Sequence, residues 1–415
     1  MKIRQVHFAK GFSAFYFDDQ AAIKAGAQQD GFVYCGTPQT ASFASIRQSG
    51  ECVSIILELD DGQLAYGDCA AVQYSGAAGR DPLFKAEHVI AVLREQLLPS
   101  LVGRDVTNFR ANTEFLDSLK DNDSLSHTAI LYGLSQALLD AAAKANHRTM
   151  FETVCDEWNL PIVAEPLALF GQSGDDRYAA VDKMILKRVD ALPHGLINNV
   201  PKKLGQRGGK LAEYVAWLSH RIRALRSDPD YRPDLHIDVY GTIGLIFDND
   251  PARIADYLVS LEKRAEPFRL YIEGPADAGS KEGQIALLGA IRQALGERAS
   301  SVRIVADEWC NTLEDVIQFA AAGCCDMVQI KTPDLGSIHN TIEAVLACKK
   351  HGVEAYQGGT CNETDISARV CLHTAMATRP ERVLVKPGMG FDEGMTVVAN
   401  EMNRVLAVLH SRAEL

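Results

Sequence analysis

Three acidic residues in the second half of the chain follow short apolar runs at a regular spacing. Asp238 lies in the sequence HIDVYG, Glu273 in LYIEGP and Asp307 in RIVADEW, so they are 35 and 34 residues apart. A single acid in such a place is usually a helix cap or a solvated charge. Three that converge would repel one another unless a cation lay between them. Because clustered carboxylate oxygens suit a hard divalent ion, the spacing predicts a Mg²⁺ site.

A lysine at the end of the next apolar run could act as a general base. Gln329 and Lys331 are two residues apart, so in a strand both side chains would point to the same face. A neighbouring Mg²⁺ and partial burial would each lower the pKa of the lysine, which suits proton abstraction near neutrality. The alternatives are a surface lysine and an ion pair between the lysine and one of the three acids.

Polar residues at the ends of other apolar runs could contact a substrate. A lone histidine is more often structural than functional, but His194 follows a run that would end opposite Lys331. There it could donate a hydrogen bond to the substrate or act as an acid or base on the opposite face. Gln172, Thr360 and Cys361 stand beside glycines at two further run ends. Neutral amides, hydroxyls and backbone N–H groups bind a carboxylate without adding charge.

The elements that must position these residues alternate between strands and helices. The chain has eight short apolar runs, at residues 167–170, 189–192, 235–239, 270–272, 302–305, 327–330, 353–356 and 383–385. Helical periodicity lies between most of them, at 209–225, 251–265, 283–295, 312–321 and 337–351. Eight strands with intervening helices indicate a (β/α)-barrel, with a doubly wound sheet as the alternative. Residues 196–212 are loop-like. Barrel enzymes place their chemistry at the carboxyl ends of the strands, where the residues above stand.

The first third of the chain has a different organisation. Residues 52–58 and 64–66 are apolar runs separated by an Asp-Gly turn, which predicts a β-hairpin. Helical spacing follows at about 89–98 and 126–146. Strands followed by helices are typical of an α+β domain. We therefore expect an N-terminal α+β capping domain over residues 1–160 and a barrel domain over residues 161–415.

Composition excludes several classes of partner. The chain has 415 residues, with 42 Lys and Arg against 54 Asp and Glu, a formal net charge of −12. This charge argues against nucleic acid and anionic membrane surfaces as partners. No stretch approaches the ~18 continuous apolar residues of a membrane span, and the N-terminus does not resemble a signal peptide. The ten cysteines are scattered without a C-x-x-C motif, so we expect free thiols and a cytoplasmic protein.

With these residues in view, the sequence resembles the enolase superfamily, in which a Lys or His base works beside Mg²⁺. Within it, the chain resembles the methylaspartate ammonia-lyase family along essentially its whole length. The stretches that carry the resemblance are FGQSG at 170–174, ALPHGLINN at 191–199, HIDVYGTIG at 236–244, YIEGPAD at 271–277, ADEWCNT at 306–312, QIKTPDLG at 329–336 and YQGGTCNETD at 356–365. The resemblance implies an enolase-type (β/α)-barrel, a modified TIM barrel, preceded by an α+β cap.

The resemblance also implies a reaction and a role for each residue. The reaction is Mg²⁺-dependent, reversible elimination of ammonia from L-threo-3-methylaspartate, an amino-diacid, to give mesaconate through a metal-stabilised aci-carboxylate. Lys331 would remove the C3 proton, and His194 would act on the epimeric face. The metal ligands would be Asp238, Glu273 and Asp307. The substrate would contact Gln172, Gln329, Thr360 and Cys361, with Gln73 and Leu384 near its amine and side chain. K⁺ activation and a homodimer are implied as well.

Three other functions remain open at this stage. A muconate cycloisomerase-like or racemase-like enzyme of the same superfamily would usually carry a K-x-K or K-x-H pair on the second strand, where this chain has Pro193-His194. A barrel aldolase would use Lys331 as a Schiff base. A metal-binding structural protein on the same scaffold would be expected to have lost part of the site.

Overall fold

Eight short parallel strands close into a barrel in the second half of the chain. The computed structural model describes residues 1–76, 80–358 and 360–413. Around the barrel the strand order is β10-β11-β12-β13-β6-β7-β8-β9. The strands are β6 (Leu169–Phe170), β7 (Ala191–Leu196), β8 (Asp234–Asp238), β9 (Leu270–Glu273), β10 (Arg303–Ala306), β11 (Met327–Lys331), β12 (Glu354–Gly358) and β13 (Arg382–Leu384). Each overlaps a predicted apolar run. The predicted barrel is confirmed, and the doubly wound alternative is wrong because the sheet closes on itself.

The barrel interior is packed with side chains. A cluster of buried residues separate from the main core consists of Phe170, Ala191, Tyr271, Val305, Met327, Tyr356 and Leu384. Residues two apart on a strand share a face. Tyr271 and Met327 belong to this cluster, and Glu273 and Gln329 lie two residues further along the same strands. The side chains of Glu273 and Gln329 therefore also point into the interior, one layer closer to the carboxyl ends of the strands. The apolar layer thus supports a polar one.

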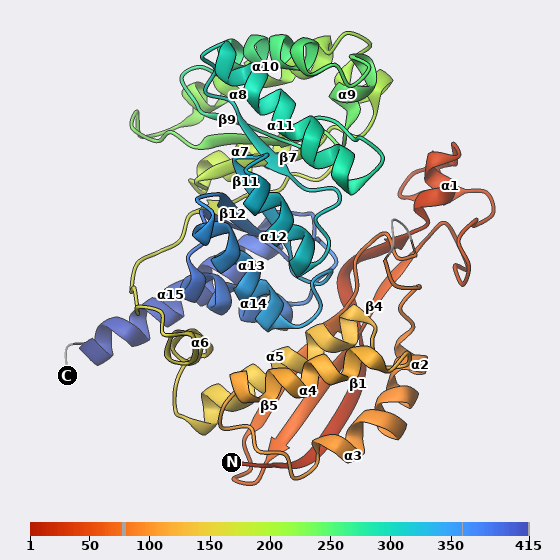
Figure 1. The fold of residues 1–415 in the computed structure, drawn as a ribbon, viewed down its shortest axis with the longest axis vertical. Coiled ribbons are helices and arrows are strands. Elements are labelled where there is room, and N and C mark those ends of the chain that lie inside the picture. Colours follow the sequence, from red (N-terminus) through yellow and green to blue (C-terminus); the bar gives the residue numbers. More distant parts are fainter. Residues whose placement is uncertain (77–79, 359, 414–415) are drawn as a thin grey trace.

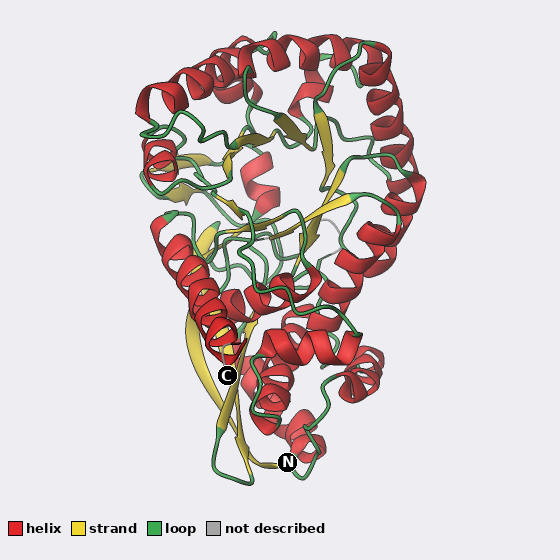
Figure 2. Cartoon of the chain, turned by 90° about the vertical axis from the view of Figure 1, so that its left-hand side faces the viewer, coloured by secondary structure: helices red, strands yellow, loops and turns green. Residues whose placement is uncertain are grey.

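Helices surround the strands (Figure 2). They are α7 (Ala179–Leu186), α8 (Gly209–Leu225), α9 (Thr242–Ile246), α10 (Pro251–Ala265), α11 (Lys281–Glu297), α12 (Leu313–Ala322), α13 (Ile338–Lys350), α14 (Asp365–Thr378) and α15 (Asp392–Ala413). All five helices predicted between strands are present, with bounds that differ by two residues or fewer. The region 196–212, predicted to be a loop, includes a turn of π-helix at Val200–Leu204 and the start of α8.

The N-terminal region is a three-stranded antiparallel sheet covered by helices. Its strand order is β1 (Ile3–Asp18), β4 (Arg47–Leu59) and β5 (Leu64–Ala70), with a small hairpin of β2 (Gln28–Asp30) and β3 (Val33–Cys35) alongside. The helices are α1 (Gln20–Lys24), α2 (Ala86–Val92), α3 (Leu98–Leu101), α4 (Thr113–Ser118), α5 (Thr128–Ala145) and α6 (Met150–Trp158). The predicted hairpin is confirmed as β4–β5. The predicted helix at 126–146 corresponds to α5, whereas β1 was not predicted.

Helix α5 lies unusually close to the sheet because two glycines face each other. A methyl group added at Gly67 of β5 would come within 2.1 Å of the carbonyl oxygen of Gly133 of α5. Helices α5 and α6 also contact α14 of the barrel, so the N-terminal region packs against the C-terminal part of the barrel (Figure 1). The boundary of the two domains at residues 160 and 161 stays a prediction.

A buried polar network joins the two regions next to the strand ends. The Lys386 ammonium donates to Glu363 Oε1 and to Thr332 Oγ1, each at 2.6 Å. The Tyr132 hydroxyl of α5 donates to Glu363 Oε2 at 3.0 Å. Lys386 and Glu363 are both almost inaccessible to water. Because Thr332 directly follows Lys331, this network fixes the backbone beside the predicted base.

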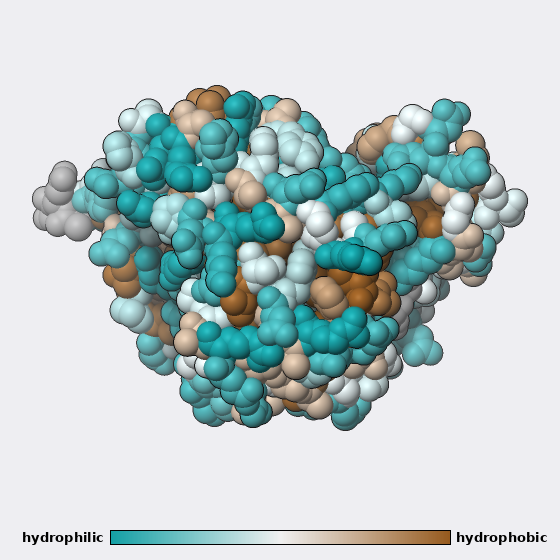
Figure 3. All heavy atoms as spheres, turned by 90° about the horizontal axis from the view of Figure 1, so that it is seen from above, coloured by the Kyte–Doolittle hydropathy of each residue, from teal (hydrophilic) through white to brown (hydrophobic). Residues whose placement is uncertain are grey.

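The sequence predicted neither a membrane-spanning helix nor disulfide bonds. Among the described residues, no helix has the length and apolar character needed to cross a membrane. The face shown in Figure 3 is largely hydrophilic, with small hydrophobic areas between. All ten cysteines are free, as the sequence predicts.

Candidate active site

The carboxyl ends of neighbouring strands bring two of the predicted metal ligands together. Asp238 ends β8 and lies beside Glu273, which ends β9, in the register of the two strands. Asp307 directly follows β10. The exposed fractions of the three residues are 2%, 0% and 7%, so all three carboxylates are buried. The structure thus places three acids at adjacent strand ends of one barrel mouth.

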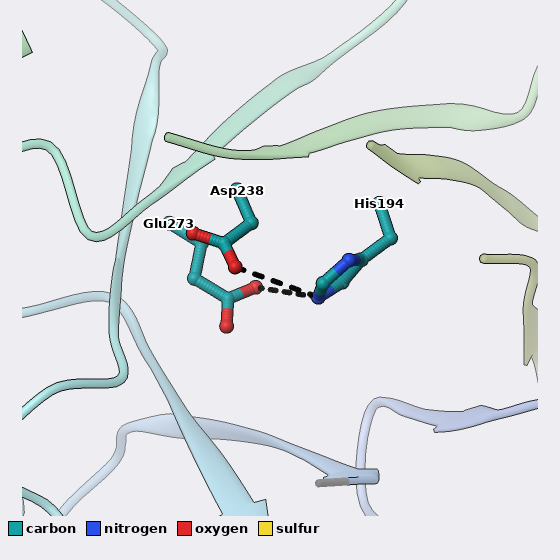
Figure 4. Close-up of side chains that lie close together, drawn as sticks. All are labelled: His194, Asp238 and Glu273. Atoms are coloured by element: carbon teal, nitrogen blue, oxygen red, sulfur yellow. Dashed lines mark ion pairs between the residues drawn. The ribbon is translucent and has the colours of Figure 1, made fainter. Parts of the chain in front are cut away.

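His194 lies against the same acids. Its Nε2 atom is 3.9 Å from Asp238 Oδ2 and 3.8 Å from Glu273 Oε2 (Figure 4). One ligand atom from each of these three residues lies within 4.8 Å of the others. The register of β7 and β8 shifts at His194, which has a φ of 60°. Such a bulge re-aims a side chain, and here the imidazole faces the acids at the barrel mouth.

The third predicted ligand, Asp307, is directed toward Lys331. Its Oδ1 atom lies 2.7 Å from Lys331 Nζ as an ion pair, but the contact lacks hydrogen-bond geometry, so this buried oxygen has no hydrogen-bond partner. Lys331 Nζ instead donates to the backbone oxygen of Asp307 at 3.0 Å and to Asn311 Oδ1 at 3.1 Å. The compact group around His194 therefore does not include Asp307.

Burial and mutual repulsion oppose the ionisation of Asp238 and Glu273. Burial raises the pKa of Asp238 well above its usual value, and repulsion from Asp307 raises it further. Burial likewise raises the pKa of Glu273, and Asp238 and Asp307 add to the effect. A cation among these oxygens would remove the repulsion. The carboxylate oxygens of Asp238, Glu273 and Asp307 are ligands of the kind that Mg²⁺ takes.

The pKa of Lys331 is raised, whereas the sequence predicted that it would be lowered. The sequence argument predicted that burial and a cationic neighbour would lower the pKa of Lys331. Burial does lower it, but the carboxylates of Asp307 and Glu308 outweigh burial and hold the pKa above its ordinary value. The prediction is thus wrong for the protein's own groups, because Lys331 was expected beside a metal rather than paired with an acid.

Sequence reasoning missed a network that holds Glu273 in place. His236 Nε2 lies 2.8 Å from Glu273 Oε2, and the Tyr356 hydroxyl donates to Oε1 at 2.7 Å. Gln329 Nε2 donates to Oε1 at 3.0 Å, so this predicted substrate residue contacts a predicted metal ligand. A signal was available for His236, because it precedes Asp238 by two residues and so shares its face of the strand.

The remaining predicted substrate residues lie around the barrel mouth. Gln172 follows β6 and donates to the backbone oxygen of Gly388 at 2.7 Å. Thr360 follows β12, and its hydroxyl accepts from the backbone of Asn362. Leu384 belongs to the apolar layer of the interior. Within the described residues, no hydrogen bond joins these three residues to one another.

Gln73 and Cys361 connect the N-terminal region with the barrel. Cys361 Sγ lies 3.6 Å from Gln73 Oε1, although the two residues are 288 positions apart. A cavity of about 130 Å³ lies at the same junction, lined on one side by residues such as Arg80 and on the other by Asn311, the partner of Lys331. A larger hollow, of about 390 Å³, is lined by residues of α11 and of the amino-terminal end of β10, away from these side chains.

Comparison with known proteins gives consistent results over the whole chain. Residues 1–159 match the family described as methylaspartate ammonia-lyase N-terminus, and residues 161–411 match methylaspartate ammonia-lyase C-terminus. The chain is 64% identical to methylaspartate ammonia-lyase from Citrobacter amalonaticus, over 99% of this chain and 100% of the relative. A crystal structure of that organism's enzyme containing (2S,3S)-3-methylaspartic acid has a TM-score of 0.97, with the same identity and coverage.

Two further solved structures are similar to this chain, one closely and one in its fold alone. A Mg complex of β-methylaspartase from Clostridium tetanomorphum is 52% identical, covers 99% of this chain and 100% of its own, and has a TM-score of 0.96. Muconate lactonizing enzyme from Pseudomonas putida is 16% identical, with a TM-score of 0.60 over 91% of this chain and 85% of its own, and shares the fold alone. The cycloisomerase, aldolase and non-enzyme alternatives are therefore set aside. The chain belongs to the methylaspartate ammonia-lyase family and is a carbon–nitrogen lyase with an enolase-type barrel.

Proposed function

We propose that this protein catalyses the Mg²⁺-dependent, reversible elimination of ammonia from L-threo-3-methylaspartate to give mesaconate. The observation that carries the proposal is the contact of a buried lysine, Lys331, with one of three buried acids at adjacent strand ends. The relative bound to (2S,3S)-3-methylaspartic acid and the relative described as a Mg complex support the substrate and the metal. Activation by K⁺, the homodimer and the cytoplasmic location stay predictions.

In this proposal Asp238, Glu273 and Asp307 hold the metal. When bound, Mg²⁺ supplies Lewis-acid stabilisation of the negative charge that develops on the substrate carboxylate. In its neutral form, Lys331 Nζ takes the proton from C3, and the C3–H electron pair becomes the C2=C3 double bond. This requires that the charges of Asp307 and Glu308, which hold the pKa of Lys331 up, be neutralised. The C2–N pair leaves with the nitrogen, so an ammonium substituent departs as neutral ammonia.

The polar residues around the mouth bind the two carboxylates of the substrate. We assign this role to Gln172, Gln329, Thr360 and Cys361, with Gln73 near the amine and Leu384 near the methyl group. Gln172 Nε2 donates to the backbone oxygens of Val385 and Gly388, and Gln329 Nε2 donates to Glu273 Oε1 and the Tyr356 hydroxyl. Each amide would therefore exchange one of these bonds for a bond to a substrate carboxylate. Leu384 belongs to the apolar layer below, which suits contact with a methyl group.

The direct test is an absorbance assay on the wild-type protein. Mesaconate is a conjugated diacid, so its formation is followed in the ultraviolet after mixing with L-threo-3-methylaspartate, Mg²⁺ and K⁺. We expect absorbance to rise, and excess EDTA to stop the rise. A flat trace from folded, Mg²⁺-loaded protein would exclude the proposed reaction and redirect the search to other carboxylate substrates.

His194→Ala is expected to slow deamination of the 3-epimer by about 100-fold or more, within the range for a general acid or base, with a much smaller effect on the (2S,3S) substrate. Burial lowers the pKa of His194 to about 4, so near pH 7 the imidazole is neutral and can accept a proton. Initial rates on both epimers provide the comparison. Equal losses on the two substrates would instead make His194 a hydrogen-bond donor common to both reactions.

A further inference from the structure

The direction of the Gln73 amide is determined by residues of the N-terminal region. Gln73 Nε2 donates to Asp18 Oδ2 at 2.6 Å, and the Asp18 backbone N–H donates to the Gln73 backbone oxygen at 2.9 Å. On its other side, Gln73 Oε1 lies 3.6 Å from Cys361 Sγ of the barrel. The amide therefore has its nitrogen toward Asp18 and its oxygen toward the barrel.

Asp18 is itself held rigidly. Arg47 donates to both of its carboxylate oxygens, Nε to Oδ1 and a terminal nitrogen to Oδ2, each at 2.7 Å. The exposed fraction of the side chain is 1% for Asp18 and 10% for Arg47. The Arg47 guanidinium also lies over the rings of Phe32 and Tyr34, at 4.5 and 5.0 Å from the ring centres. A bidentate pair of this kind fixes geometry as well as charge.

An ionised carboxylate accepts hydrogen bonds and cannot donate them. The group of Gln73 that faces Asp18 must therefore be the NH₂ group, and its carbonyl oxygen must face the opposite way. We propose that the buried Asp18–Arg47 ion pair is a positioning pair that turns the carbonyl oxygen of Gln73 toward the amino group of the substrate. This inference rests on the proposed function, and neither Asp18 nor Arg47 is expected to touch the reacting atoms.

The orientation matters because of the chemistry of the amine. An ammonium group has only N–H donors, so it needs an acceptor such as Gln73 Oε1. In the reverse reaction, ammonia held by an N–H to Oε1 keeps its lone pair free to form the bond to C2, while Lys331 returns a proton to C3. A reversed amide would donate an N–H to that lone pair and oppose the attack.

Asp18→Asn tests the positioning role. With its oxygen on Arg47 Nε, the new amide places its NH₂ where Oδ2 accepts from both Gln73 and the terminal nitrogen of Arg47. That Arg47 bond is lost, and Gln73 would turn its own oxygen toward the introduced amide and its NH₂ toward the amine. In ammonia addition to mesaconate we expect the KM for ammonia to rise by about tenfold, the effect of one hydrogen bond, while the KM for mesaconate changes by less than about twofold. Asp182→Asn, which breaks the bidentate Arg221–Asp182 pair of the barrel exterior, should change neither KM.

A second pair of variants distinguishes a change in the orientation of residue 73 from a general folding defect. Gln73→Glu places a carboxylate against Asp18 and should also raise the KM for ammonia. Adding Asp18→Asn to Gln73→Glu gives the introduced carboxylate an N–H donor and leaves its other oxygen for the amine, so the double variant should recover a KM within about threefold of the wild type. No recovery, equal changes in both KM values, or a wild-type KM for ammonia in folded Asp18→Asn would overturn the inference. An inactive wild type would overturn the proposed function as well, and that result precedes any variant.

Discussion

Lys331→Ala is expected to lower kcat for deamination of L-threo-3-methylaspartate by about 10⁴-fold, the upper end of what a general base contributes. Lys331 is the only lysine that the described structure places against the three acids, with Nζ 2.7 Å from Asp307 Oδ1. The C3 proton is very weakly acidic, so turnover depends on a base held at the right distance. Substrate binding should persist, because the carboxylate-binding residues are unchanged.

A matched variant separates proton transfer from charge. Lys331→Arg keeps a cation against Asp307 and Glu308 but cannot lose a proton near neutral pH. We expect it to be as inactive as Lys331→Ala, while its thermal unfolding and Mg²⁺ affinity remain close to those of the wild type. The assay is single-turnover deamination together with exchange of the C3 proton for deuterium from solvent. Appreciable exchange in either variant would show that another group removes the proton.

Much of the barrel could be predicted from local pattern. Short apolar runs bounded by polar residues mark strands that are buried on both faces, and all eight runs became barrel strands. Asp238, Glu273 and Asp307 were recognisable because they recur at the barrel period and end successive runs. The family motifs then added residues such as Gln73 that no spacing argument singles out.

Other features depend on contacts that no local pattern encodes. β1 alternates irregularly between buried and exposed positions, so its sequence lacks a clear strand period. The pairing of Lys331 with Asp307 depends on which way each side chain turns in a crowded mouth. The contact between Asp18 and Gln73 joins residues 55 positions apart. Such contacts exist only once folding has brought segments distant in the sequence together.

Asp238→Asn is expected to weaken Mg²⁺ binding by more than about 100-fold, because even residues that only support a metal ligand are worth 10- to 100-fold in affinity. Activity should fall at least in proportion at limiting Mg²⁺. The exchange is nearly isosteric, and the amide oxygen can still accept the hydrogen bond that Asp238 Oδ1 receives from the Tyr240 backbone at 3.0 Å. Titration calorimetry with Mg²⁺ alone measures the affinity without reference to turnover.

The same substitution should leave the thermal stability of the metal-free protein unchanged or raise it. This result would distinguish a metal ligand from an acid that stabilises the fold. Burial and the charge of Asp307 raise the pKa of Asp238, so the carboxylate costs stability when no cation is bound. Metal-free Asp238→Asn should therefore unfold at the same temperature as the wild type or higher, yet gain little from added Mg²⁺. Asp250→Asn is the control, because it replaces a helix-capping acid with an equally good cap. If Asp238→Asn keeps wild-type Mg²⁺ stabilisation, the ion must be held by other residues, and Glu273 and Asp307 become the next ones to test.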